Sequence, residues 1–185
     1  MNYLRGFIPW IAFAVVSGFS WQWAALTGLV LSLGLLVQAR RSKIALDSQI
    51  LELSTLVYFA ALTVVAFSLT DSPLRHYTGS MSMVWLALTA WGGLAISRPF
   101  TLGIAKRQTP EALWSSPVFV KVNVVITTAW AAAFTVTAVV LAVLAASNVG
   151  SAGSIPVQVA GFVIPAIFTA RYPERIRARY AAQEL

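Results

Sequence analysis

The sequence contains no cysteine and a single histidine, His76, so it has few of the side chains that metal and redox sites use. Without cysteine the chain forms no disulfide and offers no thiolate as a nucleophile or metal ligand. One histidine provides neither two haem ligands nor a histidine-rich metal site. We therefore expect this protein to have no cofactor and no bound metal.

Charged residues are also scarce. They make up 10% of the 185 residues, whereas soluble domains carry about 25%. Hydrophobic residues make up 58% of the chain, and the mean hydropathy is +0.77. The longest polar connection covers only residues 97–117, which is too short for a soluble domain. The composition predicts one integral membrane domain over residues 1–185, an all-α bundle of transmembrane helices.

The sequence shows no familiar catalytic motif. It has no glycine-rich phosphate loop, no nucleophile elbow and no pair of carboxylates within one apolar stretch. Asp71, Ser72 and His76 share a short connection, but catalytic side chains need a rigid surrounding shell that a short loop does not supply. We predict that the protein is not an enzyme.

Six stretches of the sequence are apolar enough to enter a bilayer, and basic residues flank them asymmetrically. The stretches are residues 7–20, 21–38, 50–69, 81–96, 118–146 and 155–170. Of the 13 lysines and arginines, all except Arg75 fall on one side of the alternating series. Because basic residues remain in the cytoplasm during insertion, both termini are predicted to be cytoplasmic.

The first two stretches leave the number of spans open at six or five. A straight span needs about 20 apolar residues, and the run over residues 7–38 is interrupted only near residues 17–20. Two short tilted helices would fit this run, as would one full span preceded by an interfacial or re-entrant piece. Six spans place the basic residues better, whereas five would move Arg5 to the outside.

Glu52 is the first candidate ligand-binding residue. It lies about one helical turn inside its apolar stretch and follows Asp47 and Gln49. Its carboxylate is expected to pair with a base at the end of the preceding stretch. Alternatively, it faces the bundle interior as a proton or ligand group. The candidate bases are Arg40, Arg41 and Lys43.

Lys121 and Asn123 lie near the start of the fifth apolar stretch. Lys121 is expected to extend to the lipid headgroups along its apolar stem. Asn123, Thr127 and Trp130 share one helix face by their spacing. We expect the Asn123 amide to form an interhelical hydrogen bond, or this face to line a polar cavity.

The connection over residues 97–117 is predicted to contain a short amphipathic element on the inner membrane surface. Thr109, Pro110 and Glu111 are typical of the N-cap and first turn of a short helix. Leu113 and Trp114 would enter the membrane interface, and Lys106 and Arg107 would reach lipid phosphates. Phe100, Leu102 and Ile104 would supply further apolar contacts, and Arg98 is a further candidate for binding lipid. The element either anchors the topology or binds a headgroup or a partner protein.

The net charge of +7 does not indicate a nucleic-acid-binding protein. The basic residues flank apolar stretches and do not form a soluble basic face. Anionic lipid headgroups on the cytoplasmic side are the expected counter-charge. We therefore predict membrane lipids as partners and no nucleic acid.

Small residues recur at every fourth position in two apolar stretches. They are Thr89, Gly93 and Ser97 in one, and Ala129, Ala133 and Thr137 in the other. Rows of this kind let helix backbones approach closely in lipid. The rows are expected to pack against other helices of the same chain, and the alternative is the seam of a homodimer.

Several short motifs follow one another along the chain. They are Phe7-Ile8-Pro9, Arg98-Pro99-Phe100, Pro110-x-x-x-Trp114, Val122-Asn123 with Trp130 and Phe134, and Arg171-Tyr172-Pro173-Glu174. Together these motifs resemble the intracellular septation protein A family of bacterial inner-membrane proteins. The resemblance spans most of the chain in order, although this chain is richer in alanine and valine and ends in an arginine-rich tail. It implies a multi-pass protein of the bacterial inner (plasma) membrane, with a role in envelope maintenance, division or lipid homeostasis.

Two functions are consistent with these observations, and a third, a membrane-embedded enzyme acting on a lipid, is disfavoured because no catalytic set is visible. The first is a non-enzymatic envelope protein that binds lipid, or other envelope or division proteins, through a basic cytoplasmic face. The second is a small transporter or channel for a lipid-like or small organic substrate. A continuous polar cavity reaching Glu52 or Asn123 would favour transport, and a sealed bundle with a basic underside would favour binding.

Overall fold

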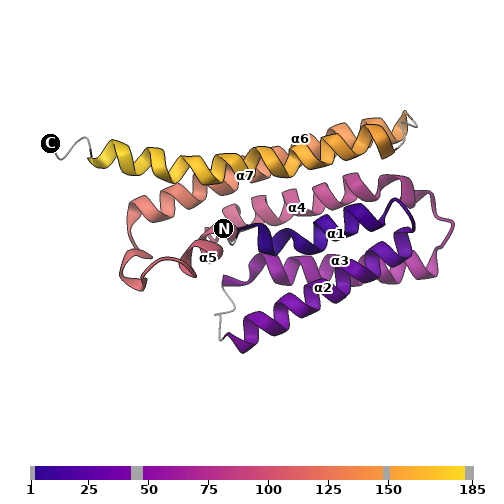
Figure 1. Cartoon of the computed structure of the whole chain (residues 1–185), viewed down its shortest axis with the longest axis horizontal. Helices are drawn as coiled ribbons and strands as arrows, with labels where there is room; N and C mark the ends of the chain where they lie inside the picture. The colour runs from indigo at the N-terminus through magenta and orange to yellow at the C-terminus, as the bar shows by residue number, and fades with distance from the viewer. Residues whose placement is uncertain (1–2, 43–47, 148–150, 182–185) are drawn as a thin grey trace.

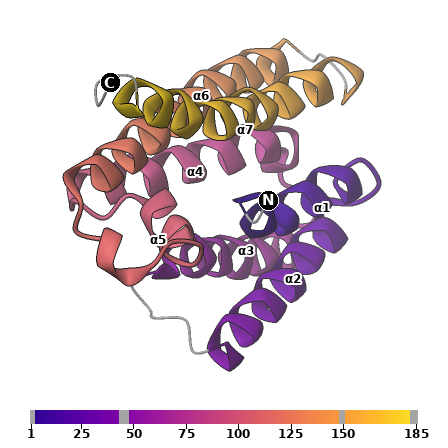
Figure 2. The same ribbon diagram turned by 60° about the vertical axis from the view of Figure 1, so that its left-hand side comes forward.

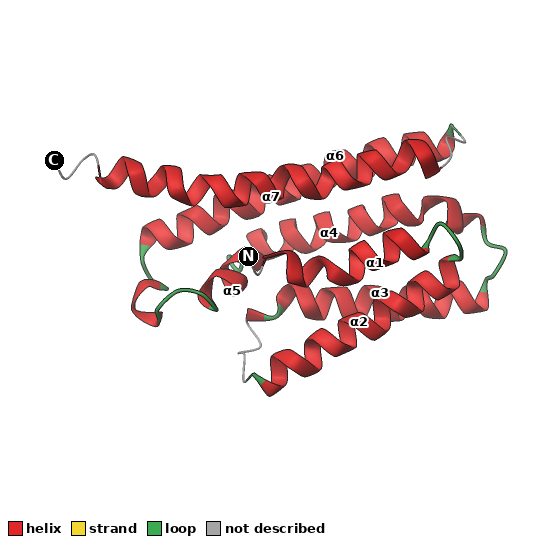
Figure 3. Ribbon diagram, viewed as in Figure 1, coloured by secondary structure: helices red, strands yellow, loops and turns green. Residues whose placement is uncertain are grey.

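The computed structural model describes residues 3–42, 48–147 and 151–181, and in these ranges helices joined by loops and turns are the only regular secondary structure (Figure 3). The helices run back and forth along the long axis of the molecule (Figure 1). In chain order the α-helices are α1 (Ile8–Val16), α2 (Trp21–Arg41), α3 (Ile50–Ser68), α4 (Thr78–Ala95), α5 (Phe100–Lys106), α6 (Pro117–Ala146) and α7 (Ser151–Ala181). Single 3₁₀ segments lie at η1 (Tyr3–Phe7), η3 (Pro73–Tyr77) and η4 (Glu111–Leu113).

The long helices match the lengths that a membrane requires. Among the described residues, four helices are long and apolar enough to cross a membrane: α2, α3, α6 and the part of α7 from Gly153 to Ile176. A fifth candidate span is the bent pair formed by residues 73–95 and α5, which meet at 78°. The expectation of a polytopic helix bundle is therefore confirmed at four to five candidate spans.

Helix α1 is the short element that left the span count open. It has only 9 residues, which is about half the length needed to cross the hydrocarbon core at 1.5 Å per residue. The turn between α1 and α2 nevertheless lies at the end of the bundle opposite to α5 (Figure 1). Arg5 consequently lies at the same end as the end of α2, where it donates a hydrogen bond to Gln38.

The helices form two groups that the N-terminal segment joins. Helices α4, α6 and α7 pack side by side, and so do α1, α2 and α3, as the second view shows (Figure 2). Phe7 of η1 stacks on Trp130 of α6, with ring centroids 4.7 Å apart, and also contacts Phe162 of α7. Trp10 of α1 contacts Phe59 of α3. An aromatic core therefore fills the space between the two groups.

The outer faces of the helices carry apolar side chains. Val64 of α3, Val136 of α6 and Ile164 of α7 are each more than 60% exposed. A soluble protein does not leave so many large apolar side chains in water. These faces are the ones that a lipid bilayer would cover.

The turn from α4 into α5 is a Schellman motif. Ser97 has a φ of 57°, a left-handed conformation that glycine usually occupies. The N–H groups of Arg98 and Ser97 donate to the carbonyl oxygens of Gly93 and Leu94, at 2.7 and 3.0 Å. A Cβ on Gly93 would lie 2.9 Å from the Arg98 carbonyl oxygen, so the reversal needs glycine there. This turn reverses the chain direction, so that α5 packs against α3 and α6.

Helix α5 differs from the predicted surface element. Phe100, Thr101 and Ile104 are buried, and Phe100 and Ile104 belong to the core. The expectation that this part of the connection lies on the inner membrane surface was therefore wrong, because α5 packs against α6 and α3. The predicted short helix after Thr109 is a single 3₁₀ turn whose N-cap position is Pro110, without a side-chain cap.

The small-residue rows pack within the chain at several positions. The Thr89 hydroxyl is hydrogen-bonded to Ser54 of α3. A Cβ on Gly161 of α7 would touch the Thr137 side chain of α6. These contacts agree with packing inside one chain, and the homodimer stays a prediction.

Candidate functional site

One end of the bundle gathers most of the charged side chains, and we call it the basic end. It comprises the last turn of α2, the first turn of α3, residues 97–107 and the first two turns of α6, all of which lie toward the left of Figure 1. Arg75 and His76 belong to η3 at the opposite end. Arg40, Arg41, Arg98 and Lys121 are exposed basic residues of the basic end. The exposed Arg171 and Arg175 lie in the last turns of α7, whereas the side chains of Arg177 and Arg179 lie outside the described residues.

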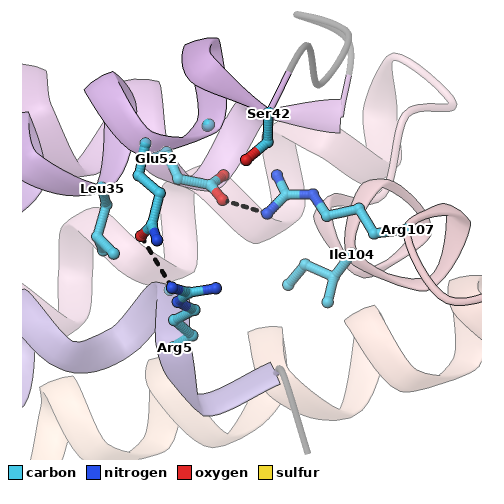
Figure 4. A pocket seen from close by; sticks show the side chains of 9 residues that line it. Arg5, Leu35, Ser42, Glu52, Ile104 and Arg107 are labelled. Carbon is cyan, nitrogen blue, oxygen red and sulfur yellow. Dashed lines mark hydrogen bonds and ion pairs between the residues drawn. The ribbon is translucent and has the colours of Figure 1, made fainter.

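A small pocket of about 60 Å³ lies at the basic end (Figure 4). Its walls come from the N-terminal turn, α2, α3 and α5. On α2 the lining residues recur at spacings of three and four, so they share one helix face. The pocket is lined by Arg5, Gly6, Leu35, Gln38, Ala39, Ser42, Glu52, Ile104 and Arg107.

An ion pair forms one wall of the pocket. The Arg107 Nη1 atom lies 2.8 Å from Glu52 Oε1, and Arg107 Nη2 donates a hydrogen bond to the Ser48 carbonyl oxygen. The Glu52 side chain is 8% exposed and that of Arg107 is 25% exposed. A carboxylate this deeply buried requires a partner, and Arg107 provides it.

The backbone of α5 also touches the start of α3 directly. A Cβ on Gly103 would lie 2.8 Å from Ser48 Cα and 3.0 Å from its carbonyl oxygen. Only glycine allows such a close approach of two backbones. Gly103 and Arg107, one helical turn apart, thus hold α5 against the segment that precedes α3.

The prediction that Arg40 or Arg41 pairs with Glu52 was wrong. Arg40 and Arg41 are exposed at the end of α2, and α5 delivers Arg107 to the carboxylate instead. Lys43 and Asp47 lie outside the described residues. The physical reason is the reversal at Ser97, which brings a base from a distant part of the sequence beneath α3.

Arg5 and Gln38 form the opposite wall, and sequence reasoning missed both as site residues. Arg5 Nη2 donates to Gln38 Oε1 at 2.8 Å, and both side chains are exposed. From the sequence, Arg5 was considered only as a positive charge that indicates on which side of the membrane the N-terminus lies. The available signal was that Gln38 is a polar residue at the end of an otherwise apolar run, one turn before Ser42.

Asn123 lies apart from this pocket. Its Nδ2 donates to the Phe119 carbonyl oxygen within α6, at 2.9 Å. The interhelical hydrogen bonds come instead from Thr101 of α5, whose hydroxyl donates to the Asn123 carbonyl oxygen and contacts the Thr127 hydroxyl at 2.7 Å. The expectation that the Asn123 side chain bridges two helices was therefore wrong. Its buried Oδ1 has no hydrogen-bond partner in the described structure.

The remaining predicted residues lie around the connection that follows α5. The Lys106 Nζ atom lies 5.1 Å from the ring centroid of Trp114, within the range of a cation–π contact. Trp114 Nε1 donates to the Thr109 carbonyl oxygen at 2.9 Å, a hydrogen bond within the connection itself. Arg98, which precedes α5, and Lys121 of α6 are exposed. The structure therefore brings Glu52 and Arg107 together and leaves the other predicted residues outside the pocket.

The fold and the site together define an all-helical protein with membrane-spanning helix lengths and a small charged pocket at one end. Within the described residues, no three histidine, aspartate or glutamate side chains gather as metal ligands would. No protein-family model, curated protein or solved structure matches this chain. The resemblance to the septation family therefore stays a prediction.

Proposed function

We propose that this is a non-enzymatic protein of the bacterial inner membrane that binds anionic phospholipid headgroups through its basic end. The observation that carries the proposal is the unequal charge of the two ends. The segments that carry Arg40, Arg41, Arg98 and Lys121 lie at one end of the bundle, and η3 with Arg75 lies at the other. A lysine or arginine near an anionic membrane surface contributes about 1 kcal/mol of binding.

The packing of the bundle supports binding over transport. Gly6 lines the pocket, and the next residue, Phe7, is 1% exposed and stacked on Trp130. Ile104 lines the pocket as well, and Phe100 on the same helix contacts Phe7 edge to face. A transporter needs a polar path toward the midplane of the membrane. Aromatic side chains occupy the space directly behind this pocket.

Binding of headgroups at the cytoplasmic surface would suit a protein of envelope maintenance, septation or lipid homeostasis. That role is the one implied by the resemblance to the septation family. The same basic end would also be the surface for envelope or division proteins with acidic faces. We propose lipid as the primary partner because the basic residues adjoin helices whose outer faces are apolar.

The experiment compares lipid binding by the purified protein in detergent with and without the exposed charges. Native mass spectrometry would count bound phosphatidylglycerol and phosphatidylcholine at several salt concentrations. We expect more phosphatidylglycerol than phosphatidylcholine, and a loss of this excess at high salt.

The triple variant Arg40→Gln, Arg98→Gln, Lys121→Gln should lose most of the excess of bound phosphatidylglycerol over phosphatidylcholine. Arg75→Gln is the control, because it removes a charge at the opposite end and should change little. Equal binding of the two lipids by the unaltered protein would refute the proposal.

A further inference from the structure

We propose that the pocket between Arg5, Gln38 and Arg107 holds one phosphodiester group. In this arrangement the group belongs to a phospholipid whose acyl chain lies along the adjoining face of α2. This inference rests on the proposed function. It adds that the pocket within the basic end selects a lipid by its phosphodiester group. Three observations carry it: the charge of the pocket, its unused hydrogen-bond donors and its continuity with an apolar groove.

The charge of the pocket matches a single negative charge. Its charged lining residues are Arg5, Arg107 and Glu52. Two positive charges and one negative charge leave a net charge of +1. Since Arg107 is paired with Glu52 at 2.8 Å, the uncompensated charge is that of Arg5. A phosphodiester carries one negative charge, whereas a phosphomonoester carries about 1.5 to 2 negative charges at pH 7.

The donors around the pocket suit phosphate oxygens. A guanidinium has five N–H donors in a planar fork that matches phosphate. In the described structure Arg5 donates one hydrogen bond, to Gln38. The Gln38 amide and the Ser42 hydroxyl lie on the same wall, and Figure 4 shows the Ser42 oxygen directed toward the group of charged side chains. A volume of about 60 Å³ is roughly that of four water molecules measured in the same way, enough for a phosphate group.

An apolar groove on α2 continues from the pocket. Leu33, Gly34 and Val37 line the groove with Arg41, and it shares Gln38 and Ser42 with the pocket. A Cβ on Gly34 would meet nothing within 4 Å, so the floor of the groove is open. Leu33 and Val37 are 44% and 49% exposed. This continuity favours a phosphate that carries an acyl chain over a free phosphate ion.

Glu52 gives the pocket its selectivity. Its carboxylate reduces the local charge from +2 to +1 and adds repulsion toward a second negative charge on a ligand. Removing this charge, as in Glu52→Gln, raises the pocket to +2 and should favour a dianionic monoester. The glutamine keeps an oxygen that accepts the hydrogen bond from Arg107.

The test measures binding of phosphatidylglycerol and phosphatidate to the purified protein by native mass spectrometry at pH 8. We expect one salt-resistant phosphatidylglycerol per chain, bound in preference to phosphatidate. Arg5→Gln should weaken this site about tenfold or more, and Glu52→Gln should reverse the preference. Gly34→Leu should fill the groove and weaken both lipids without changing any charge.

Arg40→Gln is the matched control, since Arg40 is exposed on the same helix but does not line the pocket. It should reduce only the salt-sensitive binding of the basic end. Equal effects of Arg5→Gln and Arg40→Gln would overturn the pocket while leaving the proposed function intact. Inorganic phosphate that competes as well as the lipid, with no effect of Gly34→Leu, would overturn the lipid assignment. If Glu52→Gln does not fold, Arg5→Gln and Gly34→Leu still decide the question.

Discussion

Arg107 at the end of α5 and Glu52 in the first turn of α3 form an ion pair, with Arg107 Nη1 at 2.8 Å from Glu52 Oε1. The pair therefore joins the end of α5 to the start of α3, two elements that α4 separates in the sequence. It therefore closes the basic end of the bundle and at the same time fixes the charge of the pocket. Its effect on stability is measurable separately from any effect on binding.

Replacing Arg107 by methionine should destabilise the protein by roughly 2 kcal/mol. Breaking a fully buried pair costs about 3–5 kcal/mol, because one charge stays buried without a partner, and the 25% exposure of the Arg107 side chain reduces this cost. The double variant Glu52→Gln, Arg107→Met removes the buried charge and should recover much of the loss. Reversible unfolding in detergent by added SDS measures both variants. A double variant no more stable than Arg107→Met would contradict this account.

Replacing Gly103 by alanine should destabilise the protein by about 1–3 kcal/mol. The added Cβ would lie 2.8 Å from Ser48 Cα, and neither backbone can move without separating α5 from α3. Gly92→Ala is a matched control, because Gly92 is also helical and its Cβ would meet nothing within 4 Å. The control should be neutral or up to about 1 kcal/mol more stable. The same SDS titration compares the two, and similar losses in both would argue against a close contact at Gly103.

Replacing Ser97 by glycine should stabilise the protein by about 1 kcal/mol. Ser97 has a φ of 57°, and a left-handed conformation costs a residue with a side chain roughly 1–2 kcal/mol. Part of the gain is offset because glycine also has more freedom in the unfolded chain. Ser97→Ala keeps the strain and should give no gain. Thermal unfolding in detergent would report the difference, and equal stability of the two variants would show that Ser97 is not strained.

Replacing Thr101 by valine should cost about 1–2 kcal/mol. The valine keeps the shape but removes the hydroxyl that bonds to the Asn123 carbonyl oxygen and to Thr127. Thr128→Val is the control, because the Thr128 hydroxyl is exposed and bonds only within its own helix, to Val124. The control should stay within about 0.5 kcal/mol of the unaltered protein. Indistinguishable unfolding of the two variants would mean that the buried Thr101 bonds contribute little.

The long helices could be predicted from the sequence because each is an unbroken apolar run with polar ends. The expected ranges 50–69 and 118–146 differ by only one residue at one end from α3 (Ile50–Ser68) and α6 (Pro117–Ala146). The connection 97–117 could not be predicted as well. Its pattern of apolar and basic residues suits either a membrane surface or a buried face, and only the reversal at Ser97 decides between them.

The candidate site was predicted in part for a similar reason. Glu52 and Arg107 were both identified, since a carboxylate inside an apolar stretch and a base in a short connection are unusual residues in those places. Their pairing was not, because Arg40 and Arg41 lie closer to Glu52 in the sequence. Arg5 and Gln38 were missed because their contact depends on how the N-terminal turn packs against α2.

The position of Phe7 has a consequence for the order in which the protein can be completed during synthesis. Its ring lies against Trp130 of α6 and Phe162 of α7, which follow it far along the sequence. Since synthesis proceeds from the N-terminus, η1 must wait without these partners until α6 and α7 have been made. Contacts between residues that are distant in the sequence form slowly. The η1 segment thus reaches its final place only after segments that are made later than itself, and α6 and α7 complete the interior around it.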